Sequence, residues 1–350
     1  MTLLLRFHYH LLKLTLFSYI SDSSSLQKFQ LQYLHILQHL KKTNKRPTIK
    51  DVAKKAGVTA TTISLALHNN KSIPPKTRER IFKIIKEMNY YPNYAARSLV
   101  GGKTNTIALL ADFFSTPFMQ TMLNGIEKSV VGTRFNLVQY SAKGLPEMEE
   151  ELFNRVLHGR TADALIAFNM RPGKKIVDAY NEAGFPVIMV EGGAKNLNTV
   201  TCDNVLGGRI ATEFLIKKAR KKIAIVTGKQ RHKGAQEDRL AGYKKALEEN
   251  NLEFDPKNII ETEKLNFNFG RNLFLDVISI RKDIDAVFCA AGDAVAIGIM
   301  YEAQKTGVKI PDSLAVIGYD DLEPAIYVKP SLTTVRQPGF EMGRKAVLMA

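Results

Sequence analysis

Apolar and polar residues follow two different patterns along this chain, and the change between them lies near residue 105. Before it, apolar residues recur at the three- and four-residue spacing of short amphipathic helices. After it, short apolar runs alternate with longer amphipathic stretches. A strand of a buried parallel sheet reads as such a run, because both of its faces are covered. The alternation predicts a doubly wound α/β architecture, long enough for two lobes with a cleft between them.

The strands expected from these runs are Ile107–Ala111, Leu137–Tyr140, Ala164–Phe168, Val187–Val190, Ile223–Val226, Ala286–Ala290 and Leu314–Ile317. The helices expected between them are Phe118–Val131, Glu147–Leu157, Gly207–Lys218, Arg239–Asn250, Asn268–Ile280 and Ala294–Thr306.

The segment before residue 105 predicts three helices. Two short ones lie on either side of Gly57, which can take the positive φ of a tight turn. Thr59 is positioned to cap the second helix, and Lys76–Met88 forms the third. If the second helix enters a major groove, Ala60, Thr61, Thr62 and Ser64 face base edges. The alternative is a small helical bundle without a ligand.

Charge favours the DNA-binding interpretation. Residues 46–100 hold eleven Lys and Arg against three Asp and Glu, whereas residues 101–350 hold 33 against 30. The basic excess is therefore concentrated in the three-helix segment, as a phosphate-contacting surface requires.

A second feature is the stretch Tyr90–Gly102. Asn93 can cap a helix of barely two turns, which Gly101 would end. Such a helix is too short to form alone in water and needs a partner. Leu99 beside Arg97 has the character of a minor-groove wedge with a phosphate clamp, and the alternative is an ordinary linker.

Residues Thr48 to Leu99 resemble the head and hinge of the lac-repressor (LacI/GalR) family of bacterial transcription regulators. The resemblance rests on D-V-A-x-x-A-G-V-T, T-I-S, T-R-E-R and N-Y-Y-P-N-x-x-A-R-x-L, in the family's order and spacing. It implies DNA contacts from Thr48, Thr59, Ala60, Thr61, Thr62, Ser64, Leu65, Asn69, Asn93, Tyr94, Ala96, Arg97 and Leu99. Leu65 departs from the family, which often has arginine or histidine there. Base reading should therefore depend on Thr61, Thr62 and methyl contacts.

The resemblance continues to the end of the chain through D-N-x-x-G-G (203–208), D-R-L-A-G-Y (238–243), I-G-Y-D-D (317–321) and S-L-T-T-V-R-Q-P (331–338). These are similar to the family's effector-binding core, which is akin to periplasmic sugar-binding proteins. The implied organisation is an unassigned extension (1–45), a helix-turn-helix head (46–91), a hinge and linker (92–104) and a two-lobed effector and dimerisation domain (105–350). Its lobes would span 105–205 with 335–350, and 206–334.

Polar residues that follow parallel strands converge where ligands bind. Arg239 can hold a carboxylate or sugar hydroxyls, and Asp293 and Asp320 can accept from vicinal hydroxyls. Ser115 and Phe118 could supply a hydroxyl contact and a stacking face. The alternative roles are a helix cap for each aspartate and a surface ion pair for the arginine.

The resemblance strengthens Arg239 and Asp320 and adds Asp203 and Gln337. Its expected effector is a sugar or a derivative. One departure is Gly292-Asp293, where the family commonly has Asn-Asp. The missing amide leaves the identity of the effector open.

The chain lacks enzymatic motifs such as a Walker loop, a G-x-S-x-G elbow or a His/Cys cluster. We therefore expect no cofactor, no metal and no catalytic residues. Cys202 and Cys289 each lie in an apolar run, which fits core residues in a reducing cytoplasm.

The two ends of the chain raise separate questions. Residues 1–45 contain no apolar run as long as a membrane span, so no membrane association is expected. Three interpretations of that segment stay open: an upstream extension of the reading frame, a helical arm around Leu26–Leu40, or disorder. Pro338–Ala350 is expected to form a helix. In the family a further strand and crossover follow it, so two interpretations stay open here: a truncated sequence, or a protein with an unfinished sheet edge.

The sequence therefore predicts a transcription regulator, most simply a repressor, that binds a palindromic operator on double-stranded DNA as a homodimer. Dimerisation follows from the hinge helix, which needs its symmetry mate in the minor groove. Tetramer formation stays open. The rival class is a two-lobed solute-binding receptor for transport or chemotaxis, and an enzyme with a doubly wound fold is a distant third.

Overall fold

The computed structural model describes residues 47–67, 70–91, 103–229 and 234–350. The chain divides into two compact units between Tyr94 and Ala95. The expected hinge helix lies outside the described residues.

The N-terminal unit contains the three predicted helices, α3 (Ile49–Ala56), α4 (Ala60–Leu67) and α5 (Pro75–Glu87). Thr48 and Asp51 form a capping box at the start of α3, and Gly57 ends that helix with a φ of 62°. The predicted cap of α4 is confirmed, because Thr59 Oγ1 accepts a hydrogen bond from the Thr62 N–H at 3.1 Å. Apolar side chains from all three helices and the segments beside them form one core: Val52, Ala53, Ala56, Ile63, Ala66, Ile73, Ile81 and Tyr90.

The second unit contains two parallel sheets, each with five strands in the described part of the chain. The first sheet has the order β2-β1-β3-β4-β5, with β1 (Thr106–Ala111), β2 (Asn136–Ser141), β3 (Ala164–Phe168), β4 (Val187–Val190) and β5 (Asn198–Val200). The second has the order β10-β9-β8-β6-β7, with β6 (Ile223–Gly228), β7 (Ile259–Thr262), β8 (Ala286–Cys289), β9 (Ala315–Asp320) and β10 (Thr333–Arg336).

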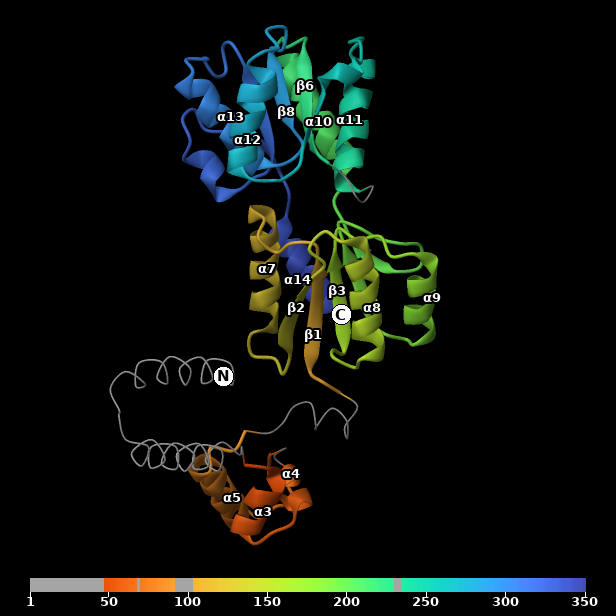
Figure 1. Ribbon diagram of the computed structural model, residues 1–350, viewed down its shortest axis with the longest axis vertical. Helices are drawn as coiled ribbons and strands as arrows, with labels where there is room; N and C mark the ends of the chain where they lie inside the picture. Colours follow the sequence, from red (N-terminus) through yellow and green to blue (C-terminus); the bar gives the residue numbers. More distant parts are fainter. Residues whose placement is uncertain (1–46, 68–69, 92–102, 230–233) are drawn as a thin grey trace, which may run out of the picture. The chain divides into compact units, whose positions relative to one another are not determined.

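Helices cover both faces of the first sheet (Figure 1). One face carries α7 (Pro117–Val130) and α14 (Gly339–Met349), and the other carries α8 (Pro146–His158) and α9 (Lys174–Glu182). Successive residues of β1 serve the two cores in turn. Ile107, Leu109 and Ala111 face α7, whereas Ala108 and Leu110 face α8.

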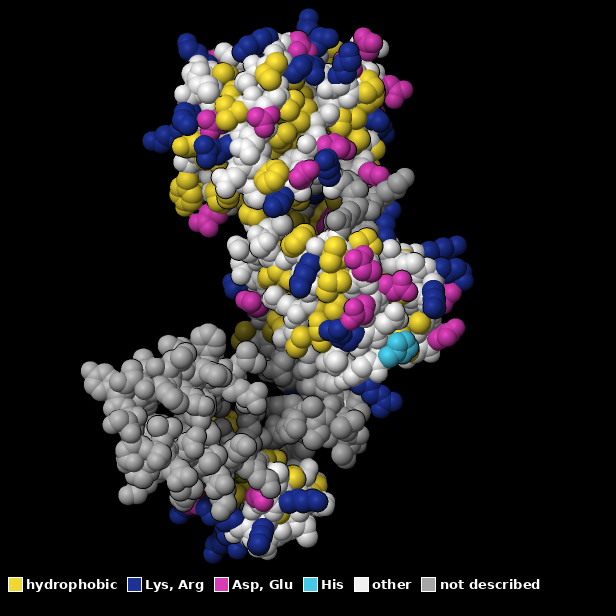
Figure 2. All heavy atoms as spheres, in the orientation of Figure 1, with side chains coloured by type: hydrophobic (Ala, Val, Ile, Leu, Met, Phe, Trp, Pro, Cys, Tyr) yellow, Lys and Arg dark blue, Asp and Glu magenta, His cyan; other side chains and the backbone are white. Residues whose placement is uncertain are grey.

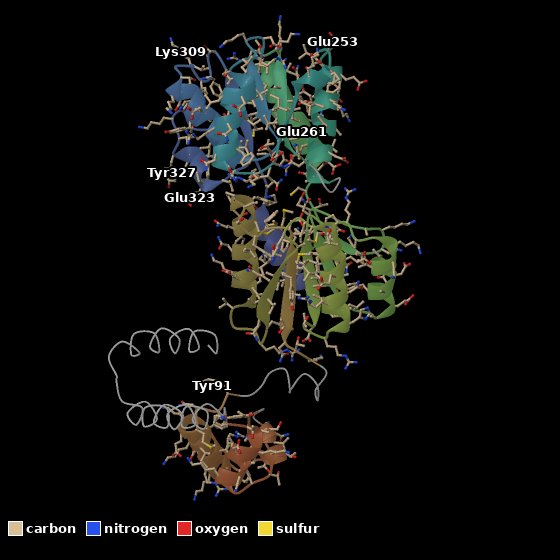
Figure 3. All side chains as sticks on the ribbon, viewed as in Figure 1. Tyr91, Glu253, Glu261, Lys309, Glu323 and Tyr327 are labelled. Carbon is tan, nitrogen blue, oxygen red and sulfur yellow. The ribbon has the colours of Figure 1, made fainter. Side chains whose placement is uncertain are left out.

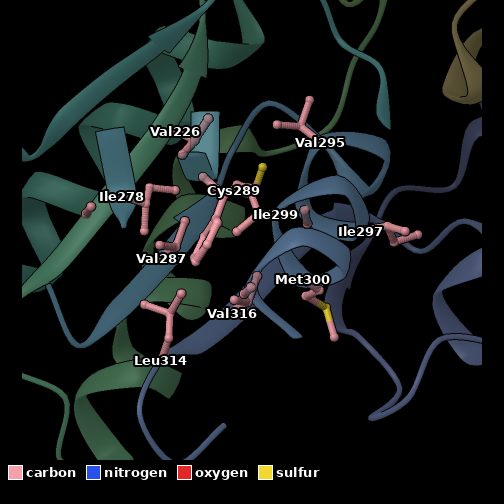
Figure 4. Packing of buried hydrophobic residues seen from close by; sticks show 14 of the residues in the cluster. Val226, Ile278, Val287, Cys289, Val295, Ile297, Ile299, Met300, Leu314 and Val316 are labelled. Carbon is pink, nitrogen blue, oxygen red and sulfur yellow. The ribbon is translucent and has the colours of Figure 1, made fainter. Parts of the chain in front are cut away.

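The second sheet is covered in the same way. Helices α10 (Asn204–Lys217) and α11 (Ala235–Glu249) pack on one face. On the other lie α12 (Phe267–Leu273), the π-helical turn η2 (Phe274–Ile278) and α13 (Asp293–Lys305). Figure 4 shows this second core, where Val226 of β6 and Val287 of β8 pack with Val295 and Ile299 of α13. The 3₁₀ turns η1 (Pro256–Asn258) and η3 (Glu323–Ile326) complete the unit.

The doubly wound α/β prediction is confirmed, with one correction to the lobes. Residues 335 and 336 were assigned to the first lobe, but they belong to β10, which pairs with β9 of the second sheet. The chain returns to the first sheet only with α14, the helix predicted over Pro338–Ala350. Edge strands β5, β7 and β10 and helix α9 were not predicted. Every described helix is too short or too polar to cross a membrane.

Candidate functional site

The surface of the head offers a short polar segment at the start of α4. Thr61 is exposed there, and Ala60, Thr62, Ser64 and Leu65 are partly exposed. Thr48 is also exposed, at the start of α3. Six further predicted DNA contacts lie outside the described residues: Asn69, Asn93, Tyr94, Ala96, Arg97 and Leu99.

Exposed basic side chains are numerous on the described head, and Figure 2 shows some of them. The exposed ones are Lys50, Lys54, Lys55, Lys71, Lys76, Arg80, Lys83 and Lys86. Only Lys55 of these is paired with a carboxylate in the described part of the chain, with Glu87 at 2.9 Å. Such a basic surface can attract a polyanion. Because the partly exposed side chains of Ala60 and Leu65 are apolar, recognition of bases would depend on hydroxyl and methyl contacts.

In the second unit, Arg239 is the centre of a buried polar group. It is 5% exposed, and its Nη1 donates to the Ala290 carbonyl oxygen at the end of β8, at 2.7 Å. The guanidinium lies 3.7 Å from the centre of the Tyr319 ring. Among the described residues its Nη2 has no hydrogen-bond acceptor. The Nη2 donors are therefore not engaged by the described part of the protein.

A chain of hydrogen bonds connects Arg239 to the first sheet. Arg239 Nε donates to Asn204 Oδ1 at 3.0 Å, and Asn204 Nδ2 donates to Glu191 Oε2 at 2.8 Å. Glu191 follows β4, and its Oε1 accepts from the Cys202 N–H at 3.0 Å. Tyr319 Oη also lies 3.3 Å from Asn204 Oδ1. Glu191, Asn204, Arg239 and Tyr319 are called the arginine cluster below.

The glycines of the D-N-x-x-G-G motif allow this cluster to form. A Cβ built on Gly207 would lie 2.0 Å from Tyr319 Oη, and one on Gly208 would lie 2.1 Å from the Arg239 carbonyl oxygen. Only glycine, which has no Cβ, lets α10 approach Tyr319 and the backbone of Arg239 so closely. The motif is therefore explained by packing around Arg239.

Asp320 lies next to the arginine cluster at the end of β9. Burial raises the pKa of its carboxyl group to about 8, while the positive charge of Arg239 acts in the opposite direction. The charges of Asp293 and Glu191 raise the pKa further. Perturbed carboxyl groups of this kind are typical of functional sites. The structure thus brings Arg239 and Asp320 together, as the sequence analysis expected.

Two other predicted ligand residues have their carboxylates engaged within the protein. Asp203 caps α10 and accepts from the Leu206 N–H at 2.8 Å. Asp293 is fully buried and accepts from the Leu322 N–H at 2.8 Å and from Thr334 Oγ1 at 2.6 Å. The alternative interpretation, structural carboxylates beside a helix start, fits both, and their contact with a ligand stays a prediction.

Gln337 has a buried side-chain amide without a hydrogen-bond partner among the described residues. It is 5% exposed, yet neither Oε1 nor Nε2 has a hydrogen-bond partner in the described part of the chain. Buried amides are normally satisfied by protein, water or ligand. Two residues later Gly339 lies against Phe118, because a Cβ there would be 3.0 Å from Phe118 Cε2. Phe118 is partly buried in the first turn of α7, and Ser115 is exposed in the loop after β1.

Three members of the arginine cluster were missed from the sequence. Glu191 directly follows a buried strand, the same signal that identified Asp320, and could have been found. Asn204 and Tyr319 stood in recognised motifs, but their roles depend on contacts between distant segments.

Burial raises the pKa of the Cys202 thiol to about 11 and that of Cys289 well above its usual value. The raised pKa values disfavour the reactive thiolate form of both residues. Within the described ranges, no group of three or more His, Cys, Asp or Glu side chains could hold a metal ion.

A helix-turn-helix head joined to a two-sheet unit with a polar cluster at its strand ends defines a class: transcription regulators that carry their own ligand-binding domain. Comparison with known families agrees. The profile of bacterial regulatory proteins of the lacI family matches residues 48–93, and that of the periplasmic binding protein-like domain matches residues 212–350.

Whole-chain relatives extend these matches. The ribose operon repressor of Haemophilus influenzae is 30% identical over 302 residues, which cover 86% of this chain and 90% of the relative. The regulator CelR of Thermobifida fusca is 31% identical over 312 residues, with 86% and 90% covered. The chain therefore belongs to the lacI family of bacterial regulatory proteins, is a transcription regulator, and is not an enzyme.

Solved structures show the same fold. A lacI-family regulator from Silicibacter pomeroyi superposes with a TM-score of 0.77 at 23% identity, covering 87% of this chain and 91% of that one. The lac repressor dimer bound to operator and an anti-inducer superposes with a TM-score of 0.72 at 23% identity and the same coverage.

Proposed function

We propose that this protein is a repressor that binds a palindromic operator as a homodimer and is released or engaged by a small sugar-like effector. The observation that carries the effector is the arginine cluster with Asp320. It combines unused guanidinium donors with a carboxyl acceptor and lies near the carboxyl ends of β4, β8 and β9. Vicinal hydroxyls can accept from Arg239 and donate to Asp320.

Further contacts support a polyhydroxyl ligand. We assign the unpaired amide of Gln337, the hydroxyl of Ser115 and the ring of Phe118 to the same site. A similar protein, CelR, was solved as a cellobiose complex, at 27% identity and a TM-score of 0.62. Together these favour a neutral sugar as the first effector to test. Membership of a family of DNA-binding regulators favours the cytoplasm as the place where the protein meets its operator.

A homodimer is favoured by an exposed apolar face on the second unit. Leu275, Tyr301, Ile326 and Tyr327 are exposed by 43%, 56%, 65% and 70%, and Figure 3 labels Tyr327. Their elements are neighbours, because Arg271 of α12 lies 5.2 Å from the ring of Tyr301 on α13. Gln304 of α13 also donates to the Lys329 carbonyl oxygen beyond η3. Exposed tyrosines and aliphatics of this kind suit a protein interface.

The test is selection of bound duplexes from a random DNA pool, followed by sequencing and by titration of the recovered sequence with salt. We expect a near-palindrome whose affinity falls steeply as salt rises. Adding the cognate sugar should change that affinity. Retention without sequence enrichment would contradict the operator proposal, and an operator affinity unaffected by every sugar in a broad panel would contradict the effector proposal.

A further inference from the structure

The turn after β9 contains two consecutive residues in unusual backbone conformations. Asp320 has a φ of 117° and Asp321 a φ of 57°. Neither is a glycine, and the first value lies outside even the left-handed helical region. Such conformations persist only where the surroundings hold them, and they gather at functional sites.

Asp293 holds this turn from α13. Its Oδ2 accepts from the Leu322 N–H, and its Oδ1 accepts from the Thr334 hydroxyl of β10. The Thr334 oxygen in turn accepts from the Asp321 N–H at 3.3 Å. One fully buried carboxylate therefore fixes the backbone on the C-terminal side of Asp320 and ties it to the neighbouring strand.

The same place on α13 fixes the side chain of Asp320. The backbone N–H of Asp293 lies close enough to the Asp320 carboxyl group to lower its pKa, against the effect of burial. Gly292 leaves the necessary space, because a Cβ there would lie 2.6 Å from Asp320 Oδ2. Gly292 itself has a φ of 107°. An asparagine at this position would displace the carboxyl group from the start of α13.

We propose that Asp293 is a positioning residue for effector binding: it does not touch the ligand but holds Asp320 in the strained conformation that presents its carboxyl group beside Arg239. This inference rests on the proposed function, because it takes Asp320 as the group that meets the effector. It reassigns Asp293 from the ligand contacts expected from the sequence.

The inference has an electrostatic consequence. The charged groups that face Asp320 are Arg239 of α11, Asp293 of α13 and Glu191 beyond β4. If the turn relaxes, the Asp320 carboxyl group gains solvent and its pKa falls from about 8. Removing the Asp293 charge lowers it further. A loosened turn is therefore visible in a titration.

The test compares Asp293→Asn and Thr334→Val, which break the same clamp, with two controls. Thr334→Val keeps the Asp293 carboxyl group, whereas Asp293→Asn removes it, so the two variants break the clamp in different ways. Because the Thr334 hydroxyl lowers the pKa of Asp293, which burial raises to about 6, the titration of Asp293 is followed beside that of Asp320. Thr334→Ser keeps the hydroxyl. Asp285→Asn is the matched control, because Asp285 accepts from the N–H groups of Lys221 and Lys222 at 2.9 and 3.0 Å, at the opposite end of β8.

Two measurements are made on the full chain. The first is a ¹³C NMR titration of side-chain carboxyl groups, which gives the titration midpoint of Asp320; its signal is assigned by its loss in Asp320→Asn. The second is calorimetry between pH 6 and pH 9, which gives affinities for ribose, cellobiose and other neutral sugars. We expect Asp293→Asn and Thr334→Val to lower the midpoint and to weaken sugar binding by about tenfold or more. Thr334→Ser and Asp285→Asn should match the wild type.

The positioning role would be overturned if the Asp320 midpoint fell in Asp293→Asn but stayed at the wild-type value in Thr334→Val. That result would leave only a charge effect of Asp293 on Asp320. If no sugar binds the wild type, the proposed effector class fails. The NMR titration still decides whether Asp293 positions Asp320, so the two failures are distinguishable.

Discussion

Arg239 is fixed in orientation before any ligand arrives. Hydrogen bonds from Nε and Nη1 hold its plane, and the Tyr319 ring supports one face. Only a guanidinium can make both bonds and stack in this way, so lysine is no substitute. A preorganised group loses little conformational entropy when it binds, which favours affinity.

The raised pKa of Asp320 makes a prediction about stability. The folded protein holds a proton on this group up to a pH of about 8, whereas the unfolded chain releases it near the ordinary value of aspartate. The folded state therefore binds more protons over that range, so stability falls as pH rises from about 4 to about 8. Asp320→Asn removes this dependence, and we expect its melting temperature to exceed that of the wild type by several degrees at pH 8.

The measurement is thermal unfolding without ligand at intervals from pH 5 to pH 8.5. Asp312→Asn is the control, because Asp312 is exposed and its removal should leave the slope unchanged. Equal pH slopes in wild type and Asp320→Asn would show that the carboxyl group is ionised throughout.

At single positions, the sequence predicted neighbours where the chemistry is local. Arg239 and Asp320 were expected near each other because polar residues after parallel strands converge at one edge of a sheet, and the resemblance singled them out; the structure brings them together. The cap at Thr59 follows from similar local rules. Other features depend on segments that only the fold brings together. These are the unpaired buried amide of Gln337 and the hydrogen bonds of Asp293 with Leu322 and Thr334.

At the scale of elements, α10 and α11 pack closely together on one face of the second sheet. Gly208 of α10 faces the backbone of Arg239, and a Cβ on Gly242 of α11 would lie 2.0 Å from the Val205 carbonyl oxygen. The pair carries Asn204 and Arg239, so its spacing sets the geometry of the arginine cluster.

Gly242→Ala should force these helices apart. Overpacking against backbone costs roughly 1–3 kcal/mol, and the displaced Arg239 should also lose affinity for the effector. Urea unfolding and sugar calorimetry measure the two effects. Gly173→Ala, at a glycine with nothing within 4 Å of a built Cβ, should change stability by less than about 1 kcal/mol. Similar losses in both variants would show that the close approach is unimportant.

The strands missed from the sequence lie at sheet edges, although β2, also an edge strand, was predicted. The central strands are continuous apolar runs, since both faces pack against helices. Of the unpredicted strands, β5, β7 and β10 lie at sheet edges and contain polar, exposed residues such as Asn198, Glu261 and Thr333. Figure 3 labels Glu261 on β7. An edge strand pairs on one side only, so its sequence carries a weaker apolar signal.

At the scale of the whole molecule, the exposed apolar face predicts the oligomeric state. Tyr301→Asp combined with Tyr327→Asp would place charges at the centre of the proposed interface, and desolvating them should prevent association. We expect a monomer in analytical ultracentrifugation and a loss of operator affinity of at least a hundredfold, because only one half-site is then engaged. Ile210→Asp on α10, 43% exposed in the wild type, is the matched control and should stay dimeric.

Regulation predicts a coupling between two binding sites on one molecule. If a sugar at the arginine cluster changes operator affinity by a given factor, the operator must change sugar affinity by the same factor, because both factors measure one coupling free energy. Typical factors are about 5 to 150. Calorimetry of the sugar with and without saturating operator duplex, and operator titrations with and without saturating sugar, give the two values independently. Equality with a factor above five supports direct control by the effector. A factor of one in both experiments would mean that the sugar binds without regulating. A coupling factor above five in the wild type that falls to one in Arg239→Lys would locate the coupled site at the arginine cluster.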